Sequence, residues 1–305
     1  MATTISIGAV GGVEFDTRNN RWKGILTPLH RSVEQVHTTL KEKLTNCVGG
    51  SRVSIRVLTT SEVELSALQQ LSIPWQDDTE LRFEAAIPVN RHDLGSIIYF
   101  GANTPKRRTS AEIRSEEWRL AGELENRVRK DRILPTGFKV EILRGGASLP
   151  DILQLRKIYQ ASYTAYITPF DAATIGRMIE ENYVAVVRDN HGKIVSVSQA
   201  EYDFFSIGGE TWRLVELADT ATDPEFRNQG LSEICKRMLI HHVRNPRTVI
   251  FAESRANFRG VQINNHNIGM HICGRLEKHC IMDSDTKTIP QEGIYANIFV
   301  FHYPL

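Results

Sequence analysis

The sequence of 305 residues has little net charge, few cysteines and no long apolar run. Its 37 Lys+Arg and 36 Asp+Glu leave a formal net charge of +1, which favours neither nucleic acid nor an anionic membrane as a partner. The start MATTISIGAVGG lacks the basic and apolar segments of a signal peptide, and no segment reaches the length of a membrane span. These absences predict a cytoplasmic protein with a small-molecule partner, and they leave a homodimer open.

The four cysteines form no close pair with the spacing of metal ligands: Cys47, Cys235, Cys273 and Cys280. A long chain with so few cysteines indicates a reduced, intracellular protein. We therefore expect no metal site.

The first third of the chain has the pattern of a small α/β domain. Residues 31–46 carry apolar residues at helical spacing, and residues 53–59 alternate as a strand does. Residues 106–136 follow with one thin apolar stripe, as expected for a helix between two domains, and the segment ends in Pro-Thr-Gly. The predicted domains are residues 1–105, a linker helix over 106–136, and a second domain over 137–305.

The second domain alternates between strand and helix patterns. A strand at 138–144 precedes two helices and a group of three strands that ends with 212–222. An amphipathic helix at 229–243 follows, then a strand, a helix at 255–267 and a closing strand at 294–303. This order predicts a central mixed, mostly antiparallel sheet flanked by helices.

A glycine stands at the start of the amphipathic helix, where Ser, Thr, Asp or Asn is the usual cap. The helix N-terminus carries unpaired N–H groups and a positive dipole end, and Gly230 removes a side chain that would block approach. Beside Arg227, this pattern is typical of a diphosphate site. The other interpretation, that Gly230 only permits close packing of helix on strand, stays open. The glycine patterns of the Rossmann fold and the P-loop are both absent.

Several segments resemble the GCN5-related N-acetyltransferase (GNAT) superfamily. The run RNQGLS (227–232) resembles its Q/R-x-x-G-x-G/A turn, with Ser232 at the sixth position, and DPEF (223–226) resembles the lead-in to that turn. The order of elements over 137–305 is also similar to that of the family. ELADTATDP (216–224) further resembles the beta-lysine epsilon-acetyltransferase subfamily, as do short stretches at 82–89 and 274–280.

The resemblance implies a GNAT fold, acetyl-coenzyme A as cosubstrate and a set of cofactor-binding residues. Backbone groups of strand 212–222 would bind the pantetheine arm, the glycine turn would bind the pyrophosphate, and an Asn at the next helix would contact the arm. The implied residues are Thr220, Ala221, Thr222, Arg227, Asn228, Gln229, Gly230, Leu231, Ser232 and Asn257.

The acidic residues on strand 212–222 are the candidates for catalysis. Glu216 is the expected general base, and Asp219 is either a second catalytic or substrate-binding carboxylate or a bulge residue. In a regular strand the two would face opposite ways. The family often uses a Tyr as general acid, but Asn264 or Asn265 stands nearest that position here, and His266 is an alternative.

The sequence therefore predicts an N-acetyltransferase that moves an acetyl group from acetyl-coenzyme A to the primary amine of a small, beta-lysine-like acceptor. Three alternatives stay open. The first is a coenzyme A-binding sensor without turnover, the second is an enzyme that uses another acyl donor, and the third is an enzyme that acts on a protein amine.

Overall fold

The computed structural model describes residues 12–305 except 18, 92–93, 108–110, 164–168, 208, 257 and 282–294. The N-terminal part contains β1 (Glu14–Asp16), β2 (Arg21–His30), α1 (Val33–Leu44), β3 (Arg52–Thr59), α2 (Leu65–Gln69), β4 (Ser72–Pro74), β5 (Glu80–Arg91) and β6 (Leu94–Asn103). Helix α3 (Ala111–Glu125) lies within the segment where the sequence predicts a linker helix.

The C-terminal part begins with β7 (Lys139–Leu143), α4 (Leu149–Ser162), α5 (Ala172–Glu181), β8 (Tyr183–Arg188), β9 (Ile194–Ile207) and β10 (Glu210–Thr222). It continues through a short 3-10 turn (Pro224–Phe226), α6 (Leu231–Val243), β11 (Thr248–Arg255), α7 (Arg259–Asn267), β12 (His271–Ile281) and β13 (Tyr295–Tyr303). The predicted order of strands and helices after residue 137 is confirmed except for β12, which the sequence did not predict.

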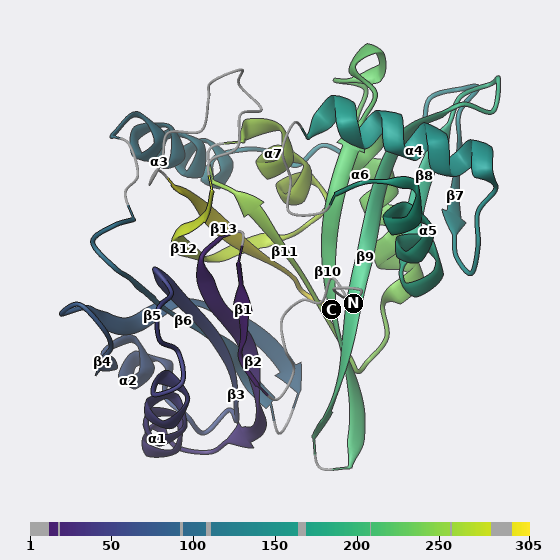
Figure 1. Ribbon diagram of the computed structural model, residues 1–305. Helices are drawn as coiled ribbons and strands as arrows, with labels where there is room; N and C mark the ends of the chain where they lie inside the picture. Colours follow the sequence, from purple (N-terminus) through teal and green to yellow (C-terminus); the bar gives the residue numbers. More distant parts are fainter. Residues whose placement is uncertain are drawn as a thin grey trace.

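Among the described residues, thirteen strands form one sheet in the order β1-β2-β3-β6-β5-β12-β13-β11-β10-β9-β8-β7, with β4 beside β5 (Figure 1). Most neighbours are antiparallel, whereas β2 pairs with β3 and β10 pairs with β11 in parallel. The predicted fold class, a mixed and mostly antiparallel sheet flanked by helices, is confirmed.

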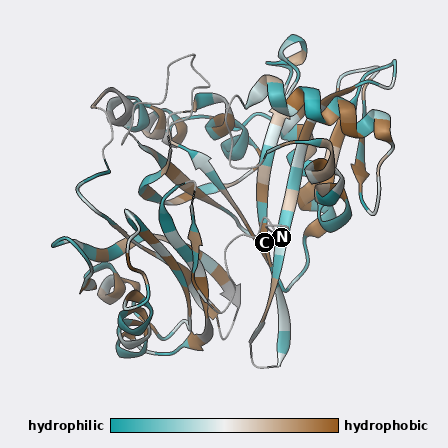
Figure 2. Cartoon of the chain, viewed as in Figure 1, coloured by the Kyte–Doolittle hydropathy of each residue, from teal (hydrophilic) through white to brown (hydrophobic). Residues whose placement is uncertain are grey.

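Helices cover both faces of the C-terminal strands. Helices α4 and α5 pack on one side through Leu155, Ile158 and Ile175, and α6 packs on the other through Ile234 and Leu239. The helices in Figure 2 carry both apolar and polar residues, as expected where one face of a helix is buried. Within the described part of the chain, no helix combines the length and the apolar character needed to cross a bilayer.

The two parts of the chain share an apolar cluster, because the sheet bends so that strands from its two halves face each other. Ile25 of β2 and Tyr99 of β6 belong to one buried cluster with Trp212 of β10 and Phe251 of β11. The division into residues 1–105, 106–136 and 137–305 remains a prediction. The apolar cluster shared by the two parts shows that an isolated C-terminal fragment would expose apolar side chains to water.

Strand β12 was not predicted from the sequence. Its pairing with β13 shifts register twice, between Ile272 and Gly274 and between Leu276 and Cys280, and Lys278 has a φ of 49°. These bulges interrupt the alternation of apolar and polar residues by which a strand is recognised.

Gly274 of β12 pairs with Ala85 of β5, where the N-terminal strands join the C-terminal ones. A Cβ at Gly274 would overlap the Cβ of Ala85, and its φ of 155° disfavours other residues. We expect Gly274→Val to destabilise the protein by about 1–3 kcal/mol, lowering Tm by about 2–4 °C for each kcal/mol. Gly122→Ala in α3, where an added Cβ meets nothing, is the matched control and should leave Tm equal or higher. Equal Tm values for the two variants, measured by calorimetry, would contradict the role of this junction.

Candidate functional site

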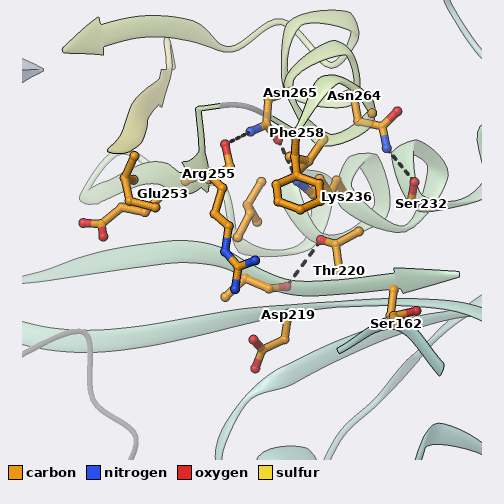
Figure 3. Close-up of a pocket in the computed structure, with 18 of the residues that line it drawn as sticks. Ser162, Asp219, Thr220, Ser232, Lys236, Glu253, Arg255, Phe258, Asn264 and Asn265 are labelled. Carbon is orange, nitrogen blue, oxygen red and sulfur yellow. Dashed lines mark hydrogen bonds between the residues drawn. The ribbon is translucent and has the colours of Figure 1, made fainter. Parts of the chain in front are cut away.

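A cavity of about 900 Å³ lies where the C-terminal strands, α6, α7 and the N-terminal strands meet. Such a volume is in the usual range for a small-molecule or cofactor site. Figure 3 shows one part of it, with Asp219 and Thr220 of β10 on one side and residues of α6 and α7 on the other. Most of the residues implied by the sequence line this cavity.

The cavity opens between β10 and β11 because the two strands separate. Their parallel pairing runs from Arg213 opposite Thr248 to Glu216 opposite Phe251, and both strands continue beyond that point. Residues 217–222 of β10 and 252–255 of β11 line the cavity after the strands part. An extended ligand can therefore lie against the edge of β10.

A bulge in β10 places Asp219 in the site. Between the pairs Ala218–Gln199 and Ala221–Val197, Asp219 and Thr220 of β10 stand opposite one residue of β9. Asp219 has a φ of 42°, which is uncommon for a residue other than glycine. The extra residue shifts the alternation of side chains along the strand.

The bulge corrects the expectation that Glu216 and Asp219 face opposite ways. Glu216 is paired directly with Glu201 of β9, so both side chains lie on one face of the sheet. The amide of Gln199, two residues from Glu201 and on the same face, donates to Asp219 Oδ2 at 2.6 Å and to Glu201 Oε1 at 2.5 Å. Asp219 therefore joins the face that carries Glu216, and both residues line the cavity.

Four carboxylates gather here: Glu201, Glu216, Asp219 and Glu253, which we call the carboxylate cluster. Burial raises the pKa of Glu216 to about 8, and the charges of Glu253 and Asp219 add to the rise while Arg56 opposes it. Burial also raises the pKa of Glu201 well above its ordinary value, with contributions from Asp219 and Glu216. Such a cluster favours bound cations and can accept a proton near neutral pH.

Basic residues of the N-terminal strands line the cavity next to the carboxylate cluster. Arg56 of β3 lies 3.7 Å from Glu253 and over the rings of Tyr99 and Phe251, and Lys23 of β2 lowers the pKa of Glu201 and Glu216. Arg21 of β2 lines the same region and pairs with Asp16. We call Arg21, Lys23 and Arg56 the basic group.

The first turn of α6 lines another part of the cavity. Gly230 is the N-cap with a φ of 77°, a left-handed conformation that glycine adopts readily, and Asn228 is also left-handed at 66°. Leu231 and Ser232 line the cavity with them, whereas Gln229 does not. Successive N–H groups in such a turn make an anion site.

Two arginines of the linker segment line the same cavity, and the sequence reasoning missed them. Arg127 and Arg132 line the cavity, and a Cβ at Gly230 would lie 2.9 Å from the Arg132 side chain. Arg227 also lines it and donates from Nε to the Thr222 carbonyl at 3.2 Å. No periodicity links these positions in the sequence, because the long-range fold brings them together. We call this region, with the first turn of α6, the arginine mouth.

Thr220, Ala221 and Thr222 line the cavity on the edge of β10. The Tyr163 hydroxyl donates to the Thr220 carbonyl at 2.7 Å, and Ser196 of β9 donates to the Ala221 carbonyl at 3.3 Å. These bonds hold the edge of the strand beyond the bulge. Asn257, the remaining implied cofactor residue, lies outside the described residues.

The candidates for a general acid lie on α7. Asn264 and Asn265 line the cavity, and Asn264 Nδ2 donates to Ser232 Oγ of α6 at 2.6 Å (Figure 3). His266 does not line it, and its Nε2 contacts the backbone carbonyl of Arg127 at 2.9 Å. Lys236 of α6, which sequence reasoning did not single out, lines the cavity beside Asn265.

No family model matches the chain, and no curated protein matches its sequence at the required significance. Similar solved structures include Arabidopsis thaliana NAA60 in complex with a bisubstrate analogue, with 11% identity over 54% of this chain and 97% of that chain, and a TM-score of 0.43. A GNAT family acetyltransferase from Elizabethkingia anophelis with acetyl-CoA bound is similar at 13% identity, 56% and 100% coverage, and a TM-score of 0.40.

The ribosomal-protein-S18-alanine N-acetyltransferase from Escherichia coli is similar at 15% identity over 55% of this chain and 93% of that chain, with a TM-score of 0.40. At these identities and TM-scores the likeness carries no inference of its own about function.

The raised pKa of Glu216 makes stability depend on pH. Because the folded protein holds this proton up to about pH 8 and the unfolded chain only to about 4.5, the free energy of unfolding falls as pH rises between these values. Glu216→Gln removes this dependence. We expect the difference between the Tm of the variant and that of wild type to increase from about pH 5 to about pH 8.5. The increase should be about 2–4 °C for each kcal/mol of unfolding free energy that the wild type loses over this range. Exposed Glu62→Gln serves as the control, and a Tm difference for Glu216→Gln that stays constant with pH would show that Glu216 titrates normally.

Proposed function

We propose that the chain is an N-acetyltransferase that moves an acetyl group from acetyl-coenzyme A to a small primary amine. The observation that carries this proposal is a single cavity that joins the arginine mouth at the start of α6 to the carboxylate cluster at the bulge of β10. An anionic nucleotide and a cationic amine would meet at the separated ends of β10 and β11. The GNAT-like motifs of the sequence support the same activity.

The residues present fit a coenzyme A pyrophosphate. Gly230 leaves the helix start without a side chain, and Arg127, Arg132 and Arg227 supply charge around it. The edge of β10 over Thr220–Thr222 would hold the pantetheine arm in the manner of an added strand. The acyl donor would contribute the reactive thioester, and this chain would orient it.

The carboxylate cluster would bind the ammonium of the acceptor and remove one proton from it. A primary amine has a reference pKa near 10.4, so proton transfer to a carboxylate with a pKa of about 8 is less uphill than transfer to an ordinary glutamate. We propose Glu216 as the general base and Asp219 as the residue that helps to hold the ammonium. The nitrogen would then attack the acetyl carbon at the end of β10.

The basic group supports an acceptor that carries a carboxylate as well as an amine. Arg21, Lys23 and Arg56 line the same cavity as the carboxylate cluster, which suits an amino acid with a second amino group, such as beta-lysine. In this proposal residues 137–305 form the catalytic domain, 106–136 a linker helix, and 1–105 the domain that closes the acceptor side.

The three alternatives have different support. A protein amine is less well suited, because residues of β2 and β3 line the region where a polypeptide acceptor would continue. A coenzyme A sensor would not need the raised pKa of Glu216. A different acyl donor is compatible with the cavity, and the following assay includes that outcome.

A thiol-release assay with a panel of amines tests the proposal. We expect release of coenzyme A with diamino acids, less with diamines that lack a carboxylate, and least with peptides. Glu216→Gln should lower turnover about 10²–10⁴-fold near pH 8, where Glu216 becomes ionised in the wild type. The deficit should be smaller at pH 7, where Glu216 is mostly protonated, and should narrow again toward pH 10 as the amine loses its proton unaided. Binding of coenzyme A without thiol release for any amine or acyl donor would identify a sensor instead.

The arginine mouth makes a separate prediction about cofactor binding. Both Asn and Asp tolerate a positive φ, so Gly230→Asn and Gly230→Asp form a matched pair that differs in one charge. We expect the Asp variant to bind coenzyme A at least about tenfold more weakly than the Asn variant, because a carboxylate would stand beside the pyrophosphate. Equal Kd values by calorimetry would place the pyrophosphate elsewhere.

A further inference from the structure

Lys236 is a buried ammonium in the side of the cavity formed by α6. Lys236 is only 1% exposed, and its Nζ donates to Asn265 Oδ1 at 2.6 Å. Within the described part of the chain, no carboxylate forms an ion pair with it. Burying a charge without a counter-charge is costly, and an apolar residue would pack here more favourably.

Neighbouring elements fix the position of this ammonium. Asn265 of α7 is fully buried and also donates from Nδ2 to Ser254 Oγ of β11 at 3.2 Å. One turn before Lys236, Ser232 of α6 accepts a hydrogen bond from Asn264 of α7. Ser232 and Lys236 therefore both face α7 and both line the cavity (Figure 3).

This placement puts Lys236 between the two ends of the site. The first turn of α6 belongs to the arginine mouth, and Lys236 lies one turn further along the helix. Thr220 of β10 lies across the pocket from it in Figure 3, whereas the Asp219 side chain points to the other side of β10. A thioester that runs from the arginine mouth toward Glu216 would pass this side chain.

We propose that Lys236 is the general acid that protonates the leaving thiolate, at a site where the usual tyrosine is absent. This inference rests on the proposed acetyl transfer. When the C–N bond has formed, the C–S bond breaks and sulfur leaves with its electron pair. The Lys236 ammonium gives one proton to that sulfur, ionised Glu216 takes one proton from the attacking nitrogen, and solvent takes the other. Protonated Glu216 then returns its proton to Lys236 through solvent, so one proton is released for each acetyl group transferred.

The acidity of Lys236 is consistent with this role. Burial lowers the pKa of Lys236 to about 8, and no charged neighbour contributes to that shift, although Asp219, Glu253 and Arg255 line the same cavity. The thiol of cysteine has a reference pKa of about 8.5. A proton donor and a leaving group of similar pKa exchange a proton with little driving force in either direction.

The test is a spectroscopic titration of bound coenzyme A, followed by ultraviolet absorbance of the thiolate. We expect the pKa of the bound thiol to be at least about one unit lower in the wild-type protein than in Lys236→Met. Lys157→Met, which removes an exposed lysine of α4, is the control and should match wild type. Should coenzyme A bind to Lys236→Met with the same thiol pKa as wild type, the role of Lys236 is wrong while the proposed function stands. Failure of wild type to bind coenzyme A would overturn both.

Turnover separates proton donation from a purely electrostatic effect. Lys236→Met should lose about 10²-fold in turnover at pH 7. Lys236→Arg keeps the positive charge but releases its proton only at very high pH, so we expect it to keep the lowered thiol pKa without restoring turnover. Wild-type turnover in Lys236→Arg would contradict proton donation. Lys236→Gln, which keeps a hydrogen-bond donor for Asn265, replaces the Met variant if that variant does not fold.

Discussion

The bulge at Asp219 is the constraint on which the rest of the site depends. One extra residue in β10 brings Asp219 onto the face that carries Glu216 and Glu201. Near the same point, pairing between β10 and β11 ends and the cavity opens. A residue other than glycine at φ 42° is unfavourable by itself, so the surrounding bonds must hold it. The bond from Gln199 to Asp219 is one of them.

Charge is distributed along the cavity in three regions. The arginine mouth attracts anions, the carboxylate cluster attracts cations, and the basic group lies beside the carboxylates. Burial raises the pKa values of Glu201 and Glu216, and the like charges of the neighbouring carboxylates add to the rise, so the cluster is unfavourable without a ligand. A bound ammonium would relieve this repulsion, so part of the binding free energy of an amine would come from the cluster itself. Substrate recognition and base strength would then have one physical origin.

The sequence was informative where the signal is local. The apolar spacing of the helix at 229–243, the glycine at its start and the strand before the turn could all be predicted from neighbouring residues. Glu216 and Asp219 were identified as acidic residues on one strand. Their common orientation could not be predicted, because a bulge changes the side-chain alternation without a clear mark in the sequence.

Long-range features were beyond sequence reasoning. Glu201 and Glu253 reach the site by strand pairing, Arg132 by the course of the linker segment, and Arg56 by the bending of the sheet. Lys236 looked like one charge on an amphipathic helix, yet packing of α7 against α6 buries it. The N-terminal strands were predicted as a separate domain, and their contribution to the cavity became visible only in three dimensions.

The most direct test of the account is a crystal structure of the protein with coenzyme A and a diamino acid such as beta-lysine. The account predicts the pyrophosphate at the first turn of α6 and an amino group within hydrogen-bond distance of Glu216 or Asp219. Coenzyme A bound away from Gly230, or an amino group directed away from the carboxylate cluster, would contradict it.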